Sequence, residues 1–285
     1  MSPPRGGRRG APRGGAPKRG APRGPAAPRG GRERRERGLG GTQVEGRQAV
    51  RELLLAGTRK VHEVVLAADA ERSDIVGDIV QLAAELRVPV REVGRGRLES
   101  ISRTDAPQGV VARAAELPET PLEELCSPTD GGPPFLLAVD GVTDPGNLGA
   151  LLRIAECAGV TGVVLPRHRA VHVTPTVTKA AAGAIEYLPM ALVGGLPNAI
   201  ATMRDRDVWV VGLDAGGDTS VHDLDLSGAG VCLVLGAEGR GLSRLVRERC
   251  DLLAAIPLHG RLASLNVAAA GAIACYEIAR RRAGS

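Results

Sequence analysis

Two glycine-bearing turns in the second half of the chain can bring a small molecule close to the backbone. An apolar run ends at Gly236, and the turn that follows it contains two more glycines and the carboxylate of Glu238. A second apolar run, residues 254–256, is followed by a proline, a glycine and then Ser264 and Asn266. Glycine permits close approach because it has no Cβ, and ligands bind at the carboxyl ends of strands in open α/β sheets. The two turns are therefore candidate parts of one small-molecule site.

A third stretch, residues 140–159, places polar groups at a turn before a helix. The spacing of its leucines predicts a helix with one buried face, for which Asn147 is a good N-cap and from which Arg153 is free to point elsewhere. In the glycine turn, Glu238 can accept hydrogen bonds from backbone N–H groups or from an arginine. Each stretch also has an ordinary structural interpretation: a capped helix with a surface arginine, an acid that caps the helix near Leu242, and a C-terminal packing helix.

Several other kinds of site are disfavoured by the sequence. His168 and His172 are four residues apart, but no cysteine or carboxylate completes a zinc set with them, so we expect no metal. The dinucleotide fingerprint and the phosphate-binding loop of nucleotide hydrolases do not occur. One Phe, two Tyr and one Trp are too few for a surface that stacks bases. Dispersed cysteines, no signal peptide and no long apolar run predict a cytoplasmic protein without a membrane segment.

The N-terminal segment differs in composition from the rest of the chain. Residues 1–41 hold eleven arginines and one lysine against two glutamates, a net charge of +10, whereas the whole chain carries +5. Residues 42–285 are therefore acidic, at −5. A segment of Arg, Gly, Pro and Ala has almost nothing apolar to bury, so we expect a disordered basic tail. Such tails bind phosphate backbones without sequence preference, and a purely solubilising role is the alternative.

The sequence after the tail begins with a small region and a linker. Residues 42–116 predict a small α/β domain, and residues 117–134, which are rich in Pro, Gly and acids, predict a linker. The expected elements of the small domain are helices over 44–55 and 73–86 and strands over 61–67, 88–93 and 109–114. In the second helix the expected buried stripe consists of Ile75, Ile79, Leu82 and Leu86.

From residue 135 to residue 285 strand and helix patterns alternate. Such alternation implies an α/β fold with a mostly parallel sheet covered by helices on both faces. The expected strands are 135–139, 162–165, 188–192, 208–213, 231–235 and 254–256, and the expected helices are 147–158, 174–186, 198–205, 242–248 and 264–282.

The three polar stretches, in this order and spacing, resemble the three motifs of the SpoU/TrmH family of RNA ribose 2′-O-methyltransferases. The matching sequences are DGVTDPGNLGALLR, VLGAEGRGLS and IPLHGRLASLNVAAAGAI, and the resemblance extends over residues 135–282. Upstream, VEGRQAVRELL and PQGVVA resemble the small N-terminal substrate-binding domain of the subgroup that acts on large-subunit ribosomal RNA. One motif alone would be weak evidence, whereas three in series are specific.

The resemblance implies a C-terminal part threaded as a deep trefoil knot, S-adenosylmethionine as cofactor, and an active site completed across a homodimer interface. The backbone around Gly236, Ile256 and Leu265 would hold the cofactor, with Leu213 and Leu258 nearby. The residues that match the family's active-site positions are Asn147, Arg153, Glu238, Ser264 and Asn266.

The resemblance leaves the role of Arg153 open between two interpretations. The family's proposed proton acceptor stands at this position, but a guanidinium stays protonated in proteins. Fixing the neighbouring phosphate and stabilising the developing alkoxide is an equal alternative. Under the same resemblance, Glu238 would orient an arginine or the ribose, and Ser264 with Asn266 would shape the pocket.

We therefore expect S-adenosylmethionine-dependent 2′-O-ribose methylation of RNA, most specifically of a guanosine in 23S ribosomal RNA, by a homodimer. A transfer RNA substrate and a non-catalytic RNA-binding role in ribosome assembly are the alternatives. Two positions depart from the family pattern: Ala268 stands where a serine is frequent, and Pro107 stands where a histidine is usual before Gln108 and Gly109. The second departure bears on RNA contact and the first only on the surroundings of the pocket.

Overall fold

The computed structural model describes residues 38–283 except 71–72, 169–171, 225 and 227. The predicted disorder of the basic tail lies outside the described residues. The last four residues that the sequence assigns to the tail are part of the fold. Leu39 is 1% exposed in the hydrophobic core, and Gly40 forms a parallel β-bridge with Val173.

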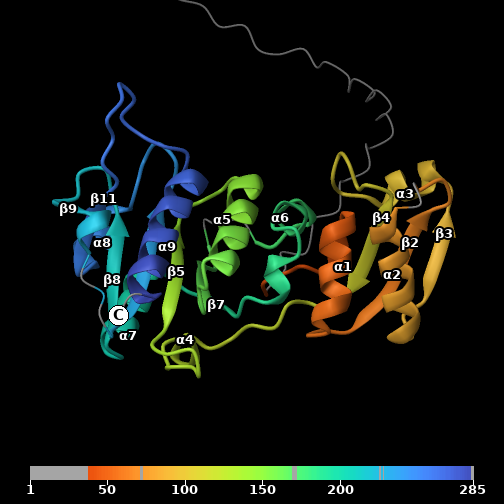
Figure 1. The fold of residues 1–285 in the computed structure, drawn as a ribbon, viewed down its shortest axis with the longest axis horizontal. Helices are drawn as coiled ribbons and strands as arrows, with labels where there is room; N and C mark the ends of the chain where they lie inside the picture. Colours follow the sequence, from red (N-terminus) through yellow and green to blue (C-terminus); the bar gives the residue numbers. More distant parts are fainter. Residues whose placement is uncertain (1–37, 71–72, 169–171, 225, 227, 284–285) are drawn as a thin grey trace, which may run out of the picture. The chain divides into compact units, whose positions relative to one another are not determined.

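The larger part of the protein, called here the large domain (residues 118–283), is built on a seven-stranded sheet (Figure 1). The strand order is β7-β6-β5-β10-β8-β11-β9, and every neighbouring pair is parallel. The strands are β5 (Phe135–Asp140), β6 (Gly162–Pro166), β7 (Met190–Val193), β8 (Val208–Leu213), β9 (Thr219–Ser220), β10 (Gly230–Gly236) and β11 (Leu252–Ala255). The predicted parallel α/β fold is confirmed.

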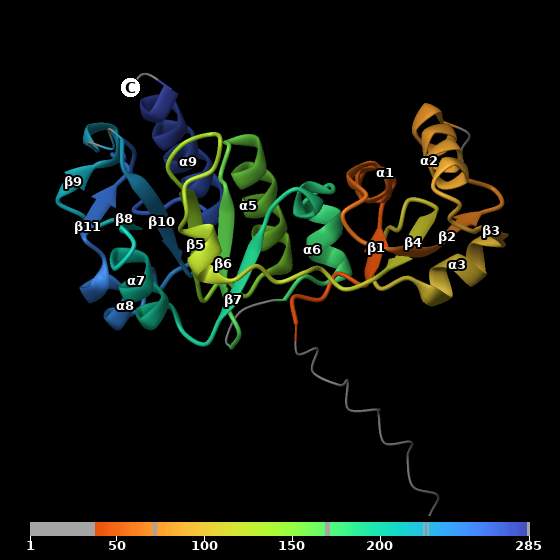
Figure 2. The same ribbon diagram turned by 90° about the horizontal axis from the view of Figure 1, so that it is seen from below.

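Helices cover both faces of this sheet (Figure 2). Phe135, Leu137 and Val139 of β5 pack with the buried faces of α5, α6 and α9, while Leu136 and Ala138 pack with α4, α7 and α8 on the other face. A strand buried on both sides reads as a continuous apolar run, which explains why the strands were predicted well. The helices are α4 (Leu122–Leu125), α5 (Pro145–Cys157), α6 (Pro175–Ala180), α7 (Leu196–Arg204), α8 (Arg244–Arg249) and α9 (Val267–Ala283), with short 3₁₀ turns η1 (Ala184–Glu186) and η2 (Val221–Asp223).

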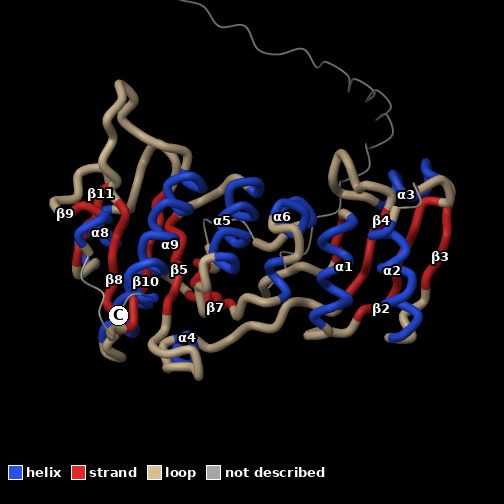
Figure 3. The backbone as a smooth tube through the Cα atoms, in the orientation of Figure 1, coloured by secondary structure: helices blue, strands red, loops and turns tan. Residues whose placement is uncertain are grey.

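The small domain (residues 42–117) has a four-stranded sheet in the order β1-β4-β2-β3 (Figure 3). The strand β4 is antiparallel to both neighbours, and β2 and β3 are parallel. Helices α1 and α2 pack on one face and α3 on the other. The elements are β1 (Gln43–Glu45), α1 (Arg47–Ala56), β2 (Val61–Ala67), α2 (Asp74–Glu85), β3 (Val90–Val93), α3 (Arg95–Ile101) and β4 (Val110–Ala114).

Two expectations for the small domain are wrong in detail. The helix expected over 44–55 begins only at Arg47, because the preceding residues pair with β4 as a strand. The buried stripe of α2 is Val76, Ile79 and Ala83, whereas Leu86, which was expected inside, is 49% exposed. The apolar residues of α2 lie on two adjacent stripes that both satisfy helical spacing, and packing against α1 selects the other one.

Three expectations for the linker and the large domain are also corrected. The helix expected over 174–186 breaks after α6, where Ala182 and Gly183 have φ values of 50° and 93°. The helix expected from Ser264 begins at Val267. The linker 117–134 contains α4, whose Leu122 and Leu125 are buried against β5 and α7, so part of it belongs to the core. None of the described helices is long and apolar enough to span a bilayer.

The strand ends of the large domain meet at one edge of the sheet. Gly236 of β10 lies opposite Asp140 of β5, and Leu213 of β8 lies opposite both Leu235 of β10 and Ala254 of β11. All these residues are at the carboxyl ends of their strands. The chain order reverses between β5 and β8, with β10 inserted between them, and such a switch point is where open α/β sheets bind ligands.

A close helix contact supports this edge and gives a test of the packing. A Cβ added at Gly149 of α5 would overlap the methyl group of Ala180 and lie 2.8 Å from the carbonyl oxygen of Val177. We expect Gly149→Ala to lower the free energy of unfolding by about 1–3 kcal/mol, the usual effect of overpacking, in urea denaturation. Gly77→Ala is the matched control: it lies within α2 with no atom within 4 Å of the added Cβ, so we expect stabilisation by about 0.5–1 kcal/mol. Equal effects of the two changes would contradict the α5–α6 contact.

Candidate active site

Three polar side chains from distant parts of the sequence meet at the strand-end edge. The Nδ2 atom of Asn266 donates hydrogen bonds to Oδ1 of Asn147 at 3.0 Å and to Oε1 of Glu238 at 2.7 Å. Because both partners are oxygens, the network fixes which end of the Asn266 amide points toward them. The three sequence motifs therefore converge on one hydrogen-bonded cluster, which we call the amide–carboxylate cluster.

The other end of the Asn266 amide attaches this cluster to helix α9. Its Oδ1 accepts hydrogen bonds from the backbone N–H groups of Ala268 at 2.8 Å and Ala269 at 3.3 Å. An acceptor at this position satisfies donors that the first turn of a helix leaves free. One side chain thus begins the helix and positions two other polar groups.

Asn147 reaches the cluster because another residue caps its helix. The N-cap of α5 is Asp144, whose Oδ1 accepts from the backbone N–H of Asn147 at 2.7 Å, and Pro145 is in the first turn. The prediction that Asn147 is the N-cap is wrong. The earlier Asp-Pro pair satisfies the helix start, so the Asn147 side chain is left to interact with Asn266.

Glu238 is held at the tip of a closed turn that follows β10. The backbone groups of Ala237 and Gly241 exchange hydrogen bonds of 3.1 and 2.8 Å, and Gly239 and Gly241 have positive φ values of 72° and 65°. The described partner of Glu238 is the amide of Asn266 rather than an arginine or a helix N-terminus. The N-cap residue of α8 is Ser243, and its backbone N–H donates to Oδ2 of Asp140 at 2.6 Å.

The residues predicted to hold the cofactor lie beside this turn. Leu213, Gly236 and Ile256 are at or next to the ends of three adjacent strands, and Leu213 and Ile256 are half-buried. Leu258 and Leu265 are 39% and 41% exposed in the loop that leads from β11 to α9. A Cβ at Gly236 would overlap the backbone of Gly241 and Leu242. Bare backbone flanked by apolar side chains is an arrangement that fits a nucleoside-containing cofactor.

Two residues predicted for the active site are not joined to the cluster. Arg153 and Ser264 are both exposed, and neither side chain makes a hydrogen bond or ion pair with any residue that the structure describes. Arg153 is six residues after Asn147, which places it about 120° around the helix. Its charge acts on the exposed thiol of Cys157, one turn further along α5, and the hydroxyl of Tyr276 on α9 donates to the Cys157 carbonyl at 3.5 Å.

Asp214, which follows β8, is not among the residues predicted from the sequence. Its carboxylate accepts from the backbone N–H of Gly216 at 2.9 Å and forms an ion pair with Arg247 of α8 at 3.3 Å. It therefore links the end of β8 to the helix that follows the glycine turn. An acid directly after a buried strand, as Asp140 ends β5, is the signal that would have found it.

Two cysteines in the core of the large domain have thiols of raised pKa. Burial, helped by the charges of Asp251 and Asp140, raises the pKa of Cys250 to about 12, and burial raises the pKa of Cys232 well above its ordinary value. A thiol is a good nucleophile only as the thiolate, so these cysteines are packing residues. No group of three potential metal ligands occurs among the described residues.

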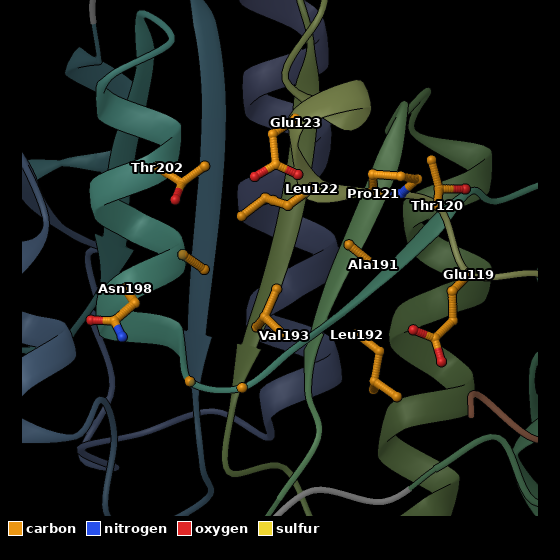
Figure 4. A pocket seen from close by; sticks show the side chains of 13 residues that line it. Glu119, Thr120, Pro121, Leu122, Glu123, Ala191, Leu192, Val193, Asn198 and Thr202 are labelled. Carbon is orange, nitrogen blue, oxygen red and sulfur yellow. The ribbon is translucent and has the colours of Figure 1, made fainter. Parts of the chain in front are cut away.

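A separate cavity of about 460 Å³ lies between the linker and the start of α7 (Figure 4). Glu123 of α4 and Asn198 and Thr202 of α7 are among the side chains around it. None of the predicted site residues lines this cavity. It is therefore distinct from the amide–carboxylate cluster.

Comparison with known proteins assigns both domains. The model of the SpoU rRNA Methylase family matches residues 134–276, and a model described as RNA 2'-O ribose methyltransferase substrate binding matches residues 43–120. The chain is 40% identical over 243 residues to the 23S rRNA (guanosine-2'-O-)-methyltransferase RlmB of Pseudomonas aeruginosa, a match that covers 84% of this chain and 96% of that protein. It is 39% identical to the RlmB protein of Ralstonia nicotianae, over 83% of this chain and 94% of that protein.

The fold is similar to solved structures over the same extent. The AdoMet-bound rRNA methyltransferase from Sinorhizobium meliloti superposes with a TM-score of 0.70 at 29% identity, covering 84% of this chain and 87% of that chain. The fold over most of the chain is therefore similar to that of a protein whose title describes it as an rRNA methyltransferase.

The amide–carboxylate cluster makes a prediction about stability and pH. Asn266→Asp keeps an oxygen for the α9 cap but replaces the amide donor by a second carboxylate beside Glu238. Like charges raise the pKa of such a pair in the folded protein above its value in the unfolded chain, which is near 4. The loss of stability is therefore absent below about pH 4 and appears as the pH rises through the raised pKa of the folded state. We expect destabilisation by about 1 kcal/mol at pH 7, in urea denaturation at pH 4 and 7.

Asn266→Ala is the control for this prediction. It removes the cap and the donor without adding a charge, so its cost of about 1 kcal/mol should be the same at both pH values. A pH-independent effect of Asn266→Asp would argue against the observed contact between Asn266 and Glu238.

Proposed function

The chain belongs to the SpoU rRNA methylase family, and on this basis we propose that it methylates the ribose 2′-hydroxyl of a guanosine in 23S ribosomal RNA. It is an RNA ribose methyltransferase, and its cofactor is S-adenosylmethionine. The observation that carries the choice of substrate is the match with relatives named for this activity over nearly their whole length. That match includes the substrate-binding part, residues 43–120.

We propose that the strand-end residues hold the cofactor. The bare backbone of Gly236 would take the close contact, and Leu213, Ile256, Leu258 and Leu265 would enclose the apolar parts. When bound, S-adenosylmethionine supplies a methyl group on a positively charged sulfur, which is already activated for transfer. The chain then needs to align the ribose hydroxyl and to help its proton leave.

The amide–carboxylate cluster supports the first of these tasks. Asn266, held by its bonds to the start of α9, keeps Asn147 and Glu238 in place. We propose that the free acceptor oxygen of Glu238 orients the ribose and that Ser264 shapes the pocket beside it. Groups fixed before the substrate arrives lower the entropy cost of alignment.

We propose an electrostatic role for Arg153. A guanidinium cannot serve readily as a base because it stays protonated, but it can bind the phosphate next to the target and stabilise charge that develops on the ribose oxygen. The exposed position of Arg153, free of ion pairs with the described residues, leaves its donors available for that contact.

We propose that the protein works as a homodimer through α9 and its surroundings. Ile273 and Tyr276 on α9 are 39% and 53% exposed, and Leu262 in the preceding loop is 81% exposed. Grouped exposed apolar side chains are typical of protein interfaces. Arg153 is exposed on α5, which packs against α9, so we propose that a second copy bound at α9 brings its own arginine near the first copy's site.

We also propose the trefoil knot that the family resemblance implies. After β11, which lies beyond β8, the chain returns across the strand ends so that α9 packs against α5. A knot is rare in proteins, and this return of the chain is the observation that supports one here. We also propose that the chain is divided into a basic tail, a substrate-binding domain, a linker and a methyltransferase domain. We further propose that the tail binds phosphate and that the protein is cytoplasmic.

The direct test is methyl transfer from radiolabelled S-adenosylmethionine to ribosomal and transfer RNA from a strain that lacks the gene. We expect one protected ribose in 23S RNA, mapped by resistance to alkaline cleavage. Label in transfer RNA would retain the chemistry and change the substrate. If no RNA is labelled and the cofactor does not bind, a role in ribosome assembly replaces catalysis.

The role of Arg153 predicts a specific loss. Arg153→Ala should reduce kcat by about a hundredfold or more, because a donor to developing charge is removed, while the Kd for S-adenosylmethionine changes less than threefold. Single-turnover methyl transfer and calorimetry measure the two quantities. Near-normal turnover of this variant would remove Arg153 from the mechanism.

The close contact at Gly236 predicts a loss of cofactor binding. Gly236→Ala should weaken S-adenosylmethionine binding about tenfold or more, which corresponds to about 1.4 kcal/mol, because the turn must open to admit the methyl group. The matched control is Gly194→Ala, which has no atom within 4 Å of the added Cβ and should bind normally. Unchanged affinity of Gly236→Ala would place the cofactor elsewhere.

A further inference from the structure

One arginine holds together the place where the chain crosses between the two domains. The side chain of Arg59 is 2% exposed and that of Glu186 is fully buried. The Nε and Nη2 atoms of Arg59 donate to the two carboxylate oxygens of Glu186 at 2.9 and 2.6 Å. Arg59 belongs to the small domain and Glu186 to η1 of the large domain, so this bidentate ion pair spans the domain boundary.

The same guanidinium also binds both chain segments that connect the domains. Its Nη1 atom donates to the carbonyl oxygens of Gly41, on the entering segment, and of Ala115, on the leaving segment, each at 2.6 Å. The two segments are hydrogen-bonded to each other as well, from Leu117 N–H to the Gly40 carbonyl at 3.0 Å. We call this set of contacts the junction.

Further contacts around the junction fix the angle between the domains. The hydroxyl of Tyr187, next to Glu186, donates to Oε2 of Glu52 on α1 at 2.8 Å. Gly183 approaches so closely that a Cβ there would overlap the Glu52 side chain. Helix α1 therefore lies directly on the η1 segment, without room for the two to slide.

A buried ion pair adds little to the stability of a protein but restricts the relative orientation of the parts that carry its two groups. Taking both charges out of water costs about as much as their attraction returns, and an apolar pair of the same size is often as stable. A guanidinium–carboxylate fork, in contrast, is strong only when its two hydrogen bonds are parallel. The geometry of Arg59 and Glu186 therefore selects one relative orientation of the domains.

We propose that Arg59 and Glu186 are positioning residues for the RNA, which hold the small domain at a fixed orientation to the amide–carboxylate cluster. This inference rests on the proposed function, in which the small domain binds part of the RNA whose ribose is methylated. Contacts with RNA on the small domain then contribute to correct placement of the target without a further ordering step. Because Arg59 is buried, it acts through the domain arrangement rather than through contact with RNA.

The test uses the full-length protein and two variants of the junction. Glu186→Gln keeps the shape of the side chain but removes its charge, and the double variant Arg59→Met with Glu186→Leu replaces the pair by an apolar contact that does not leave a charge unpaired. The matched control is Arg204→Met, which breaks an exposed ion pair with Asp251 of 2.9 Å far from the junction.

Kinetics and hydrogen exchange are measured for each variant. For both junction variants we expect KM for 23S RNA to rise about tenfold, with kcat and the Kd for S-adenosylmethionine within about twofold of the wild type. In the double variant, which leaves no charge unpaired, the amides of Gly41, Ala115 and Leu117 should exchange at least about tenfold faster, while amides inside the two sheets keep their protection, because only the junction opens. The control variant should match the wild type in all of these.

Different failures have different meanings. Faster exchange throughout both sheets of the double variant would make the pair a stability element only and overturn the proposal. An unchanged KM for RNA, with normal wild-type activity, would overturn the positioning role while leaving the proposed function intact. A wild-type protein that transfers no methyl group to RNA would overturn the proposed function itself.

Discussion

The contact of Gly236 with the backbone of Gly241 and Leu242 is the constraint on which the site depends. There is no space for a side chain at this point, so the turn after β10 closes directly onto the strand that it leaves. Closure holds Glu238 at the tip of the turn and directs Leu242 into the core beneath the sheet. Because Gly236 has no side chain, the turn can pack closely on the strand, and this packing fixes the position of Glu238 in the proposed active site.

Much of the fold could be predicted because burial on both faces of a parallel sheet leaves a clear record in the sequence. Strand β2 was predicted to the residue and six of the seven strands of the large domain to within about two residues, whereas the short strand β9 was not predicted. The choice between competing local signals was not predictable. Both Asp144 and Asn147 can cap α5; Asp144 does so in the structure, and the Asn147 side chain is left to accept from Asn266, a contact between residues far apart in sequence. The pairing of Arg59 with Glu186, far apart in sequence, leaves no local pattern.

The charge of the protein adds a condition on how it recognises RNA. Residues 42–285 carry a net charge of −5, so general attraction to phosphate cannot come from the folded part as a whole and must come from local arginines or from the tail. Non-specific attraction speeds encounter but does not choose a nucleotide. Under the proposed function, the choice of the target ribose then depends on the geometry with which the two domains present their surfaces.

The buried ion pair between Arg59 and Glu186 bears on this geometry. Removing one partner would leave an uncompensated charge in the interior, at a cost of about 3–5 kcal/mol, but exchanging both for apolar side chains is often neutral. Stability alone therefore does not require Arg59 and Glu186. What an apolar contact lacks is direction, since it tolerates rotation and sliding. The fork between Arg59 and Glu186, tied at Nη1 to both connecting segments, restricts the domains to one angle, and a rigid angle is what a protein needs when it binds RNA in one domain and modifies it in the other.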